Sequence, residues 1–330
     1  SVKIFVTRKI PGEHLDKLIA AGYDIDVSIF DRPLLPEELI QKVKGVDAII
    51  SLLTDKIDGA VMDAAGATLR IIANYAVGAD NIEVRGATDR GIVVTNTSSV
   101  EVNEAVAEHT WALILCLSRR IIESDEAVRR GAYRGWEPDI FLGRNVVGKT
   151  LGIIGLGKIG TCVAKRARGY NMNVLYNKHN PDPEAEKELG IKFASLDELL
   201  ANSDFITLHV PLTDETRHMI NTATLAKMKR GAFLVNTARG AVVEECALVE
   251  SLRSGHLAGA ALDVFENEPT VHPELINMQN VITTPHVASA TYEARDKMSQ
   301  QVVEAVLDSL SGRMPENIVN KDVWPKKRTH

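Results

Sequence analysis

The chain has 330 residues, of which 45% are apolar and 25% are charged. This length predicts two domains, and the composition is that of a globular protein with a sizeable hydrophobic core. Thirty-eight basic residues against 44 acidic ones leave a formal net charge of −6, which argues against broad electrostatic binding to nucleic acid.

Short β-branched runs alternate with amphipathic stretches through the first hundred residues. This alternation is typical of a parallel sheet with helices on its faces. The predicted strands cover residues 2–6, 25–29, 48–52, 70–73 and 92–94, and the predicted helices include 36–44 and 58–65. The loop after the first strand contains a single glycine, Gly12, so it offers no dinucleotide-binding turn.

A long helix is predicted over residues 98–121, where Ser98 and Glu101 have the spacing of a capping box. At about 1.5 Å per residue this helix is long enough to leave one domain and enter another. After an irregular stretch, a second alternating series begins. Its predicted strands are 150–154, 173–176, 205–209, 232–235, 260–264 and 281–283, and a last helix covers 292–310. We therefore expect an α/β protein with two doubly wound parallel-sheet domains.

A glycine-rich motif follows the first strand of the second series. It has the pattern GxGxxG at Gly155, Gly157 and Gly160, between the strand at 150–154 and a predicted helix at 158–168. Gly155 permits a tight turn, Gly157 lets the backbone approach a pyrophosphate, and Gly160 lets helix and strand pack closely. The free N–H groups of the helix N-terminus would face the anion. The context favours a dinucleotide site over a plain turn.

The residue after the next predicted strand bears on the choice of cofactor. Asn177 stands where an acidic side chain would bind the ribose hydroxyls of NAD, and Lys178 follows it. A neutral side chain followed by a cation removes repulsion toward a 2′-phosphate and offers attraction. We expect NADP(H) to be favoured, with NAD(H) as the alternative. In that alternative Asn177 binds the ribose hydroxyls and Lys178 is a solvated surface cation.

Three polar residues follow three later strands: Arg239, Glu268 and His286. Ligands of doubly wound folds bind beyond the carboxyl ends of the strands. Histidine can give a proton to the alkoxide that hydride transfer creates, and a neighbouring carboxylate favours its protonated form. Arginine can bind an α-oxo-carboxylate in a bidentate manner. Together with the glycine turn, the three residues indicate reduction of a 2-oxo acid.

Each of these three residues also has a purely structural interpretation. His286 would be a structural histidine, Arg239 a member of a loop ion pair, and the Glu268-Pro269 dipeptide a turn. The combination favours the chemical interpretation, because all three follow strands of the series that carries the glycine turn.

With these motifs the chain resembles the D-isomer-specific 2-hydroxyacid dehydrogenases over essentially its whole length. Within that family it is most similar to the glyoxylate/hydroxypyruvate reductases. The matching segments are residues 74–82, 155–160, 236–240, 263–269 and 284–286. The departure is Asn177, where NAD-dependent members carry Asp; it puts the identity of the cofactor in doubt and leaves the reaction unaffected.

The resemblance implies a role for each matching residue. Arg239 would bind the substrate carboxylate and carbonyl, His286 would donate the proton, and Glu268 would be the partner of that histidine. The remaining substrate contacts would be the backbone N–H groups of Val77 and Gly78 and the side chain of Leu53. The implied cofactor contacts are Gly155, Leu156, Gly157, Lys158, Ile159, Asn177, Lys178, His179, Asn180, Val210, Pro211, Thr216, Thr237, Ala238, Arg239, Asp263 and His286. No metal site is implied.

The resemblance also implies how the chain is divided. Residues 1–99 and 291–330 would form a discontinuous, flavodoxin-like substrate-binding domain, and residues 100–290 an inserted Rossmann dinucleotide-binding domain. A homodimer would form through the cofactor domain, with Trp136 near the cleft of the partner.

We therefore expect a cytoplasmic NAD(P)H-dependent reductase of small 2-oxo acids, glyoxylate and hydroxypyruvate first, that binds neither nucleic acid nor membrane. The expected location rests on the absence of a charged-then-apolar leader at Ser1 and on three widely spaced cysteines. Two alternatives stay open. One is a related dehydrogenase acting on D-lactate or phosphoglycerate, and the other is a non-enzymatic, dinucleotide-sensing scaffold of the corepressor type.

Overall fold

A computed structural model describes residues 1–329 and divides the chain into two compact units. Unit 1 comprises Ser1–Val102 together with the segment from Ala290 onward, and unit 2 comprises Asn103–Ser289. The breaks predicted from the sequence fall after residues 99 and 290, and those between the two units fall after residues 102 and 289. No helix within residues 1–329 is long and apolar enough to cross a membrane.

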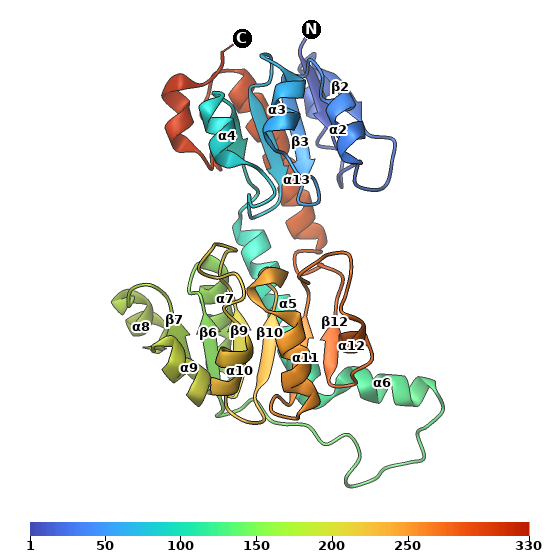
Figure 1. The fold of residues 1–330 in the computed structure, drawn as a ribbon, viewed down its shortest axis with the longest axis vertical. Coiled ribbons are helices and arrows are strands. Elements are labelled where there is room, and N and C mark those ends of the chain that lie inside the picture. The colour runs from blue at the N-terminus through green and yellow to red at the C-terminus, as the bar shows by residue number, and fades with distance from the viewer. Residues whose placement is uncertain (330) are drawn as a thin grey trace. The chain divides into compact units, whose positions relative to one another are not determined.

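Unit 1 is built on a five-stranded sheet in the order β2-β1-β3-β4-β5, of which Figure 1 labels β2 and β3. All neighbouring strands pair in parallel. The order reverses between β1 and β3, which is the switch point of a flavodoxin-like fold and confirms the expected class. The strands are β1 (Lys3–Val6), β2 (Asp24–Val27), β3 (Ala48–Leu52), β4 (Ile71–Tyr75) and β5 (Val93–Thr95).

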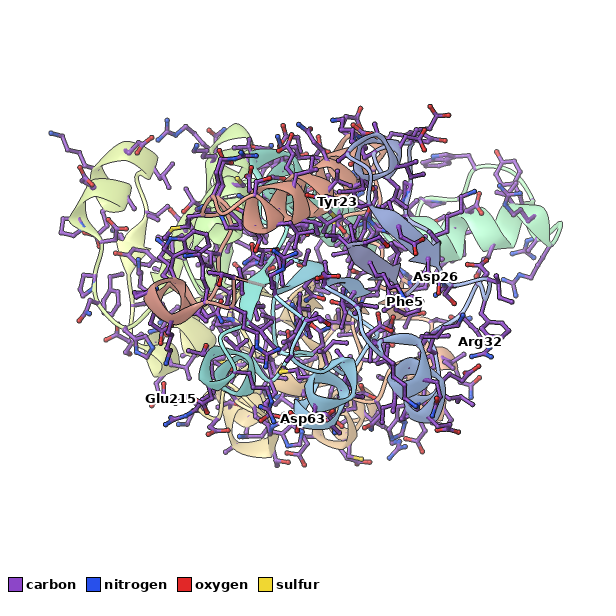
Figure 2. The ribbon with its side chains drawn as sticks, turned by 90° about the horizontal axis from the view of Figure 1, so that it is seen from above. Phe5, Tyr23, Asp26, Arg32, Asp63 and Glu215 are labelled. Atoms are coloured by element: carbon purple, nitrogen blue, oxygen red, sulfur yellow. The ribbon has the colours of Figure 1, made fainter. Side chains whose placement is uncertain are left out.

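The core of unit 1 lies between its sheet and the surrounding helices. Phe5, Ile49 and Ile72 from three adjacent strands are fully buried against apolar residues of the helices on one face. Figure 2 labels Phe5 inside this unit, whereas Arg32 and Asp63 lie at its periphery. The helices are α1 (Asp16–Ala20), α2 (Pro36–Lys42), α3 (Gly59–Ala65), α4 (Val84–Asp89) and α13 (Tyr292–Leu310), followed by the 3-10 helix η3 (Lys321–Lys326). Helix α13 packs against β4, so a distant part of the chain completes the unit.

The predicted long helix is α5 (Val100–Arg119), and the boundary between the units falls inside it. Its cap differs from the prediction. The Ser99 hydroxyl accepts a hydrogen bond from the Val102 N–H at 3.1 Å, which is the N-cap geometry. Ser98 instead donates its own N–H to the Asn96 side chain at 3.3 Å. The N-cap is therefore Ser99 and not Ser98, and since its N3 residue is Val102, the predicted capping box is wrong.

Unit 2 contains a seven-stranded parallel sheet in the order β12-β11-β10-β9-β6-β7-β8. The order reverses between β6 and β9, which confirms the Rossmann class and marks the edge where ligands of such folds bind. The strands are β6 (Thr150–Ile154), β7 (Asn173–Asn177), β8 (Lys192–Phe193), β9 (Phe205–Leu208), β10 (Phe233–Asn236), β11 (Gly259–Leu262) and β12 (Val281–Thr283).

Helices cover both faces of this sheet (Figure 1). Ile153 packs with the helices of one face and Ile154 with those of the other, as expected for consecutive residues of a strand. The first face is covered by α5, α7 (Lys158–Ala167) and α8 (Pro183–Leu189). The second is covered by α9 (Leu196–Asn202), α10 (Thr222–Lys227), α11 (Glu245–Arg253) and α12 (Pro273–Ile276). Helix α6 (Ile121–Arg129) follows α5.

Candidate active site

The glycine turn after β6 has the geometry that its sequence predicts. Gly155 has φ +94, and a side-chain carbon there would lie 2.4 Å from the His209 carbonyl oxygen. A carbon at Gly160 would lie 2.3 Å from the Gly155 carbonyl oxygen. By contrast, a carbon at Gly157 would meet nothing within 4 Å. Two glycines therefore allow close packing, and the third leaves the approach to helix α7 open.

The N-terminus of α7 suits an anionic group. Gly157 is the N-cap and offers no side chain to the first amides of the helix. Such amides have no acceptor within their own helix and carry the positive end of the helix dipole. The turn also lies at the switch point of the sheet, because β6 and β9 are neighbours there. These features fit the pyrophosphate of a dinucleotide.

The residues beyond β7 are held by local contacts. Asn177 is the last residue of β7, one residue later than predicted, and its side-chain amide donates to the Ala194 carbonyl at 2.9 Å. The Lys178 ammonium lies 3.5 Å from the Asp182 carboxylate, and about a third of each side chain is exposed. His179 is 3.9 Å from Glu215 and is well exposed. A partly exposed cation thus stands next to a neutral residue at this edge.

The loop after β9 supplies the opposite side of the switch point. The Thr216 hydroxyl donates to the Pro211 carbonyl at 2.6 Å and accepts from the Thr213 N–H at 2.8 Å. These bonds close the loop on itself. His209, just beyond β9, is half-buried, and the loss of solvent around its ring lowers its pKa to about 3. It is neutral near neutral pH and bonds to Thr207 at 2.8 Å.

His286 and Glu268 form a close pair. His286 Nδ1 lies 2.9 Å from Glu268 Oε2, and about 30% of each side chain is exposed. The other oxygen of Glu268 accepts the Phe265 N–H at 3.1 Å. Because a carboxylate can only accept, Nδ1 carries the proton and Nε2 remains for another partner. His286 also has φ +54, a conformation that residues other than glycine rarely adopt.

Asp263 holds the segment that carries His286. Its side chain is fully buried and accepts bonds from the Thr284 hydroxyl at 2.7 Å and from the N–H groups of Val287 at 2.8 Å and Ala288 at 3.0 Å. Burial works to raise the pKa of Asp263, but contacts with His109, Thr284 and the two amides lower it overall. These contacts show a structural role, and the predicted contact of Asp263 with the cofactor stays a prediction.

Helix α5 contributes two supporting residues that are not among the predicted site residues. His109 lies 3.1 Å from the Thr284 hydroxyl, and the Thr110 hydroxyl is 2.9 Å from that of Thr237. The two neighbours on one helix therefore hold the segments after β12 and β10. In the sequence these two polar residues stand directly before the apolar run of the helix at residues 111–117, and polar side chains next to a buried run are a signal for buried polar contacts.

Arg239 follows β10 in a loop that is bonded to itself. The Asn236 side chain donates to the Arg239 carbonyl at 2.9 Å and accepts the Ala238 N–H at 3.0 Å. A carbon at Gly240 would lie 1.9 Å from the Phe265 backbone, so this loop packs directly on the one that leads to Glu268. Since β10, β11 and β12 are neighbours, the three predicted catalytic residues follow three adjacent strands.

The predicted substrate contacts of unit 1 also follow adjacent strands. Leu53 comes after β3 and is 40% exposed, and Val77 and Gly78 come after β4. Within residues 1–329 the N–H groups of Val77 and Gly78 donate no hydrogen bond. Two neighbouring amide donors thus remain for a ligand of unit 1.

Comparison with known proteins gives consistent relatives. The sequence model of the family described as "D-isomer specific 2-hydroxyacid dehydrogenase, NAD binding domain" matches residues 111–288. The chain is 47% identical over 325 residues to the glyoxylate reductase of Thermococcus onnurineus (strain NA1), covering 97% of this chain and 96% of that protein. A solved structure from Thermus thermophilus matches with a TM-score of 0.89 at 42% identity, covering 96% of this chain and 100% of that one. A glyoxylate reductase from Paecilomyes thermophila matches with a TM-score of 0.86 at 34% identity, covering 98% and 99%.

Proposed function

Because this chain belongs to the D-isomer-specific 2-hydroxyacid dehydrogenase family, we propose that it reduces small 2-oxo acids, glyoxylate first and hydroxypyruvate second. The observation that carries this proposal is the 2.9 Å contact between His286 and Glu268, in the unit whose switch point holds the glycine turn. An imidazole paired with a carboxylate is suited to give a proton to a developing alkoxide.

Each proposed site residue has its own role in the reaction. A bound nicotinamide cofactor supplies the hydride that adds to the 2-oxo carbon. Arg239 binds the substrate carboxylate and polarises the carbonyl, and the amides of Val77 and Gly78 hold the same carboxylate. His286 gives the Nε2 proton to the carbonyl oxygen as negative charge develops there. Glu268 orients the ring and stabilises its positive charge before the transfer.

We propose NADPH as the preferred cofactor and NADH as the weaker one. The amides of residues 156–159 would bind the pyrophosphate, and residues 178–180 would bind the adenosine ribose. Asn177 brings no negative charge toward a 2′-phosphate, whereas Lys178 brings a positive one that Asp182 partly offsets at 3.5 Å. We expect a moderate preference for this reason. The other proposed contacts are Val210, Pro211, Thr216, Thr237, Ala238 and Asp263.

The proposal is tested by kcat/KM for glyoxylate, hydroxypyruvate and pyruvate, each with NADPH and with NADH. Glyoxylate with NADPH should give the highest value. A strong preference for NADH contradicts the proposed cofactor, and a preference for pyruvate indicates a D-lactate dehydrogenase. The absence of turnover with every 2-oxo acid contradicts an enzyme and favours the scaffold.

The same assay with His286→Asn tests the proton donor. We expect kcat to fall by roughly 100-fold or more, because the variant lacks the proton while keeping a similar shape. The Kd for NADPH should stay within about twofold. His256→Asn is the matched control, since His256 is partly buried and its ring bonds to the Met228 carbonyl at 2.8 Å, which is not one of the proposed site groups. A His286 variant with near wild-type kcat contradicts the assignment.

We also propose that two copies associate through unit 2, because exposed apolar side chains gather between residues 121 and 147. A cytoplasmic location stays a prediction; the three cysteines, at positions 116, 162 and 246, are free thiols.

A further inference from the structure

The side chains of Asn74 and Asn81 contact the two segments of unit 1 that carry the proposed substrate contacts. These segments are the turn at residues 52–55 and the loop with Val77 and Gly78. Asn74 is the penultimate residue of β4 and is fully buried. Its amide nitrogen donates to the Gly78 carbonyl at 3.1 Å and to the Asn81 side-chain oxygen at 2.8 Å. Its own side-chain oxygen accepts the Ser51 hydroxyl of β3 at 2.9 Å. Asn74 therefore ties Gly78 to the neighbouring strand.

Asn81 holds the segment at residues 52–55 by hydrogen bonds. Its amide nitrogen lies 3.1 Å from the Leu52 carbonyl, 2.9 Å from the Asp55 carbonyl and 3.2 Å from the Asn74 side-chain oxygen. The Asp55 N–H donates to the Leu52 carbonyl at 3.0 Å, so residues 52–55 form a β-turn with Leu53 inside it. Asn81 thus holds both ends of the turn from which Leu53 projects.

The side chain of Asp55 also anchors this turn. The Asp55 carboxylate is buried and accepts the Thr7 hydroxyl at 2.5 Å and the Leu52 N–H at 2.8 Å. The ends of β1, β3 and β4 are therefore linked by one polar network. In such a network a group that loses its partner is costly, so the arrangement of the loops is narrowly defined.

From these contacts we infer that Asn74 and Asn81 are positioning residues for substrate binding, which fix Leu53 and the amides of Val77 and Gly78 relative to one another. The inference rests on the proposed function, in which these groups hold the carboxylate and line the pocket. Neither asparagine touches the substrate. They act because a small displacement of the donors weakens a carboxylate contact strongly.

An asparagine is needed at position 81 for an electrostatic reason. Three acceptor oxygens, two of them carbonyls of residues 52 and 55, converge on one amide nitrogen. Aspartate has the same shape but would place a carboxylate oxygen against these oxygens, where it can only repel them. The substitution Asn81→Asp therefore releases the turn with almost no change in volume.

The test compares Asn81→Asp with the wild-type enzyme. We expect KM for glyoxylate, and Kd for the unreactive carboxylate analogue oxamate in the presence of NADPH, to rise about tenfold. The fall in kcat should be smaller, and Kd for NADPH should be unchanged. If Asn81 only stabilised the fold, Asn81→Asp would lower the melting temperature without raising KM more than it lowers kcat.

Asn320 provides the matched control in the same unit. It is also buried, and its side chain bonds to Thr88, Ile92 and Val94, which belong to neither of the two segments. Asn320→Asp should lower the melting temperature as much as Asn81→Asp does, yet leave KM and the Kd for oxamate unchanged.

The outcomes separate this inference from the proposed function. If the wild-type enzyme reduces glyoxylate and Asn81→Asp lowers the melting temperature without raising KM, the inference fails and the proposed function stands. If Asn81→Asp does not fold, Ser51→Ala decides, because it removes one bond to Asn74 and should raise KM about threefold; an unchanged KM overturns the inference. If the wild-type enzyme reduces no 2-oxo acid, the proposed function fails and the inference with it.

Discussion

His286 illustrates how a single residue is held in an unfavourable conformation by its neighbours. A left-handed backbone at a residue other than glycine costs on the order of 1 kcal/mol or more. Here the His286 N–H donates to the carbonyls of Asp263 at 2.9 Å and Thr284 at 3.0 Å, while the ring bonds to Glu268. The conformation turns the side chain toward its carboxylate partner. Such strain is typical of residues whose direction matters for function.

Asp263 should make a pH-dependent contribution to stability. Its folded pKa is lowered, so the ionised form stabilises the fold. This stabilisation is complete above the unfolded pKa of about 3.9 and is lost as the pH falls through the lower folded value. Asp263→Asn should reduce the free energy of unfolding by about 2 kcal/mol near pH 7, because an amide cannot accept all these bonds.

Urea unfolding of both proteins at several pH values measures this effect. The difference between wild type and Asp263→Asn should be largest near neutral pH and should shrink below about pH 4. Asp214→Asn is the control, since Asp214 is exposed and should give no difference at any pH. If the difference in the free energy of unfolding stays constant down to about pH 3, the charge of Asp263 is not the cause of the difference.

At the scale of elements, strong apolar runs predict that an element exists and whether it is a helix or a strand. Capping contacts decide where the element begins and ends. The predicted strands 48–52, 150–154 and 281–283 and the helix 292–310 match the structure. Other strands are displaced by one or two residues, as at β10 and β11. Their ends depend on pairing with neighbours, for example Asn236 with Leu262, which no local pattern encodes. The two-residue strand β8 is not among the predicted strands, because so short a strand has no periodicity.

Helix α5 provides a direct test of the cap. Ser99→Ala should reduce the free energy of unfolding by about 1 kcal/mol, because the Val102 N–H loses its acceptor. Ser98→Ala is the neighbouring control and should have an effect below about 0.5 kcal/mol. Hydrogen exchange of the first-turn amides of α5 locates the change. If Ser98→Ala is the more destabilising variant, Ser98 caps the helix as the capping-box prediction states, and the Ser99 cap is contradicted.

At the scale of the whole molecule, the chain ends belong to one unit. Asn320 accepts the Val94 N–H at 2.9 Å, and the Arg328 side chain donates to the carbonyls of Gly66 and Leu69 at 2.9 and 3.0 Å. These contacts join residues more than 200 positions apart. Periodicity and spacing describe local order, so they cannot reveal such pairs. The resemblance to a known family supplied the expectation of a discontinuous domain.

The segment between residues 121 and 147 exposes more apolar surface than an isolated chain in water would favour. Trp136 is 84% exposed and Leu142 is 64% exposed. The other exposed apolar side chains of this segment are Ile121, Ile122, Val128, Tyr133, Ile140 and Val147. Exposed apolar side chains concentrated in one segment are typical of a protein interface, where aromatic residues are enriched. A second copy is the proposed partner, since homodimers are the commonest assemblies of soluble proteins.

The double variant Trp136→Glu with Leu142→Glu should convert a dimer to a monomer, because each new carboxylate would have to be buried without a partner at the interface. Sedimentation velocity measures the change in mass. Ile29→Glu is the matched control: Ile29 is 89% exposed but belongs to unit 1, so this variant should sediment as the wild type does. A double variant that remains dimeric would place the interface elsewhere on the chain, and a wild-type chain that sediments as a monomer would contradict the dimer itself.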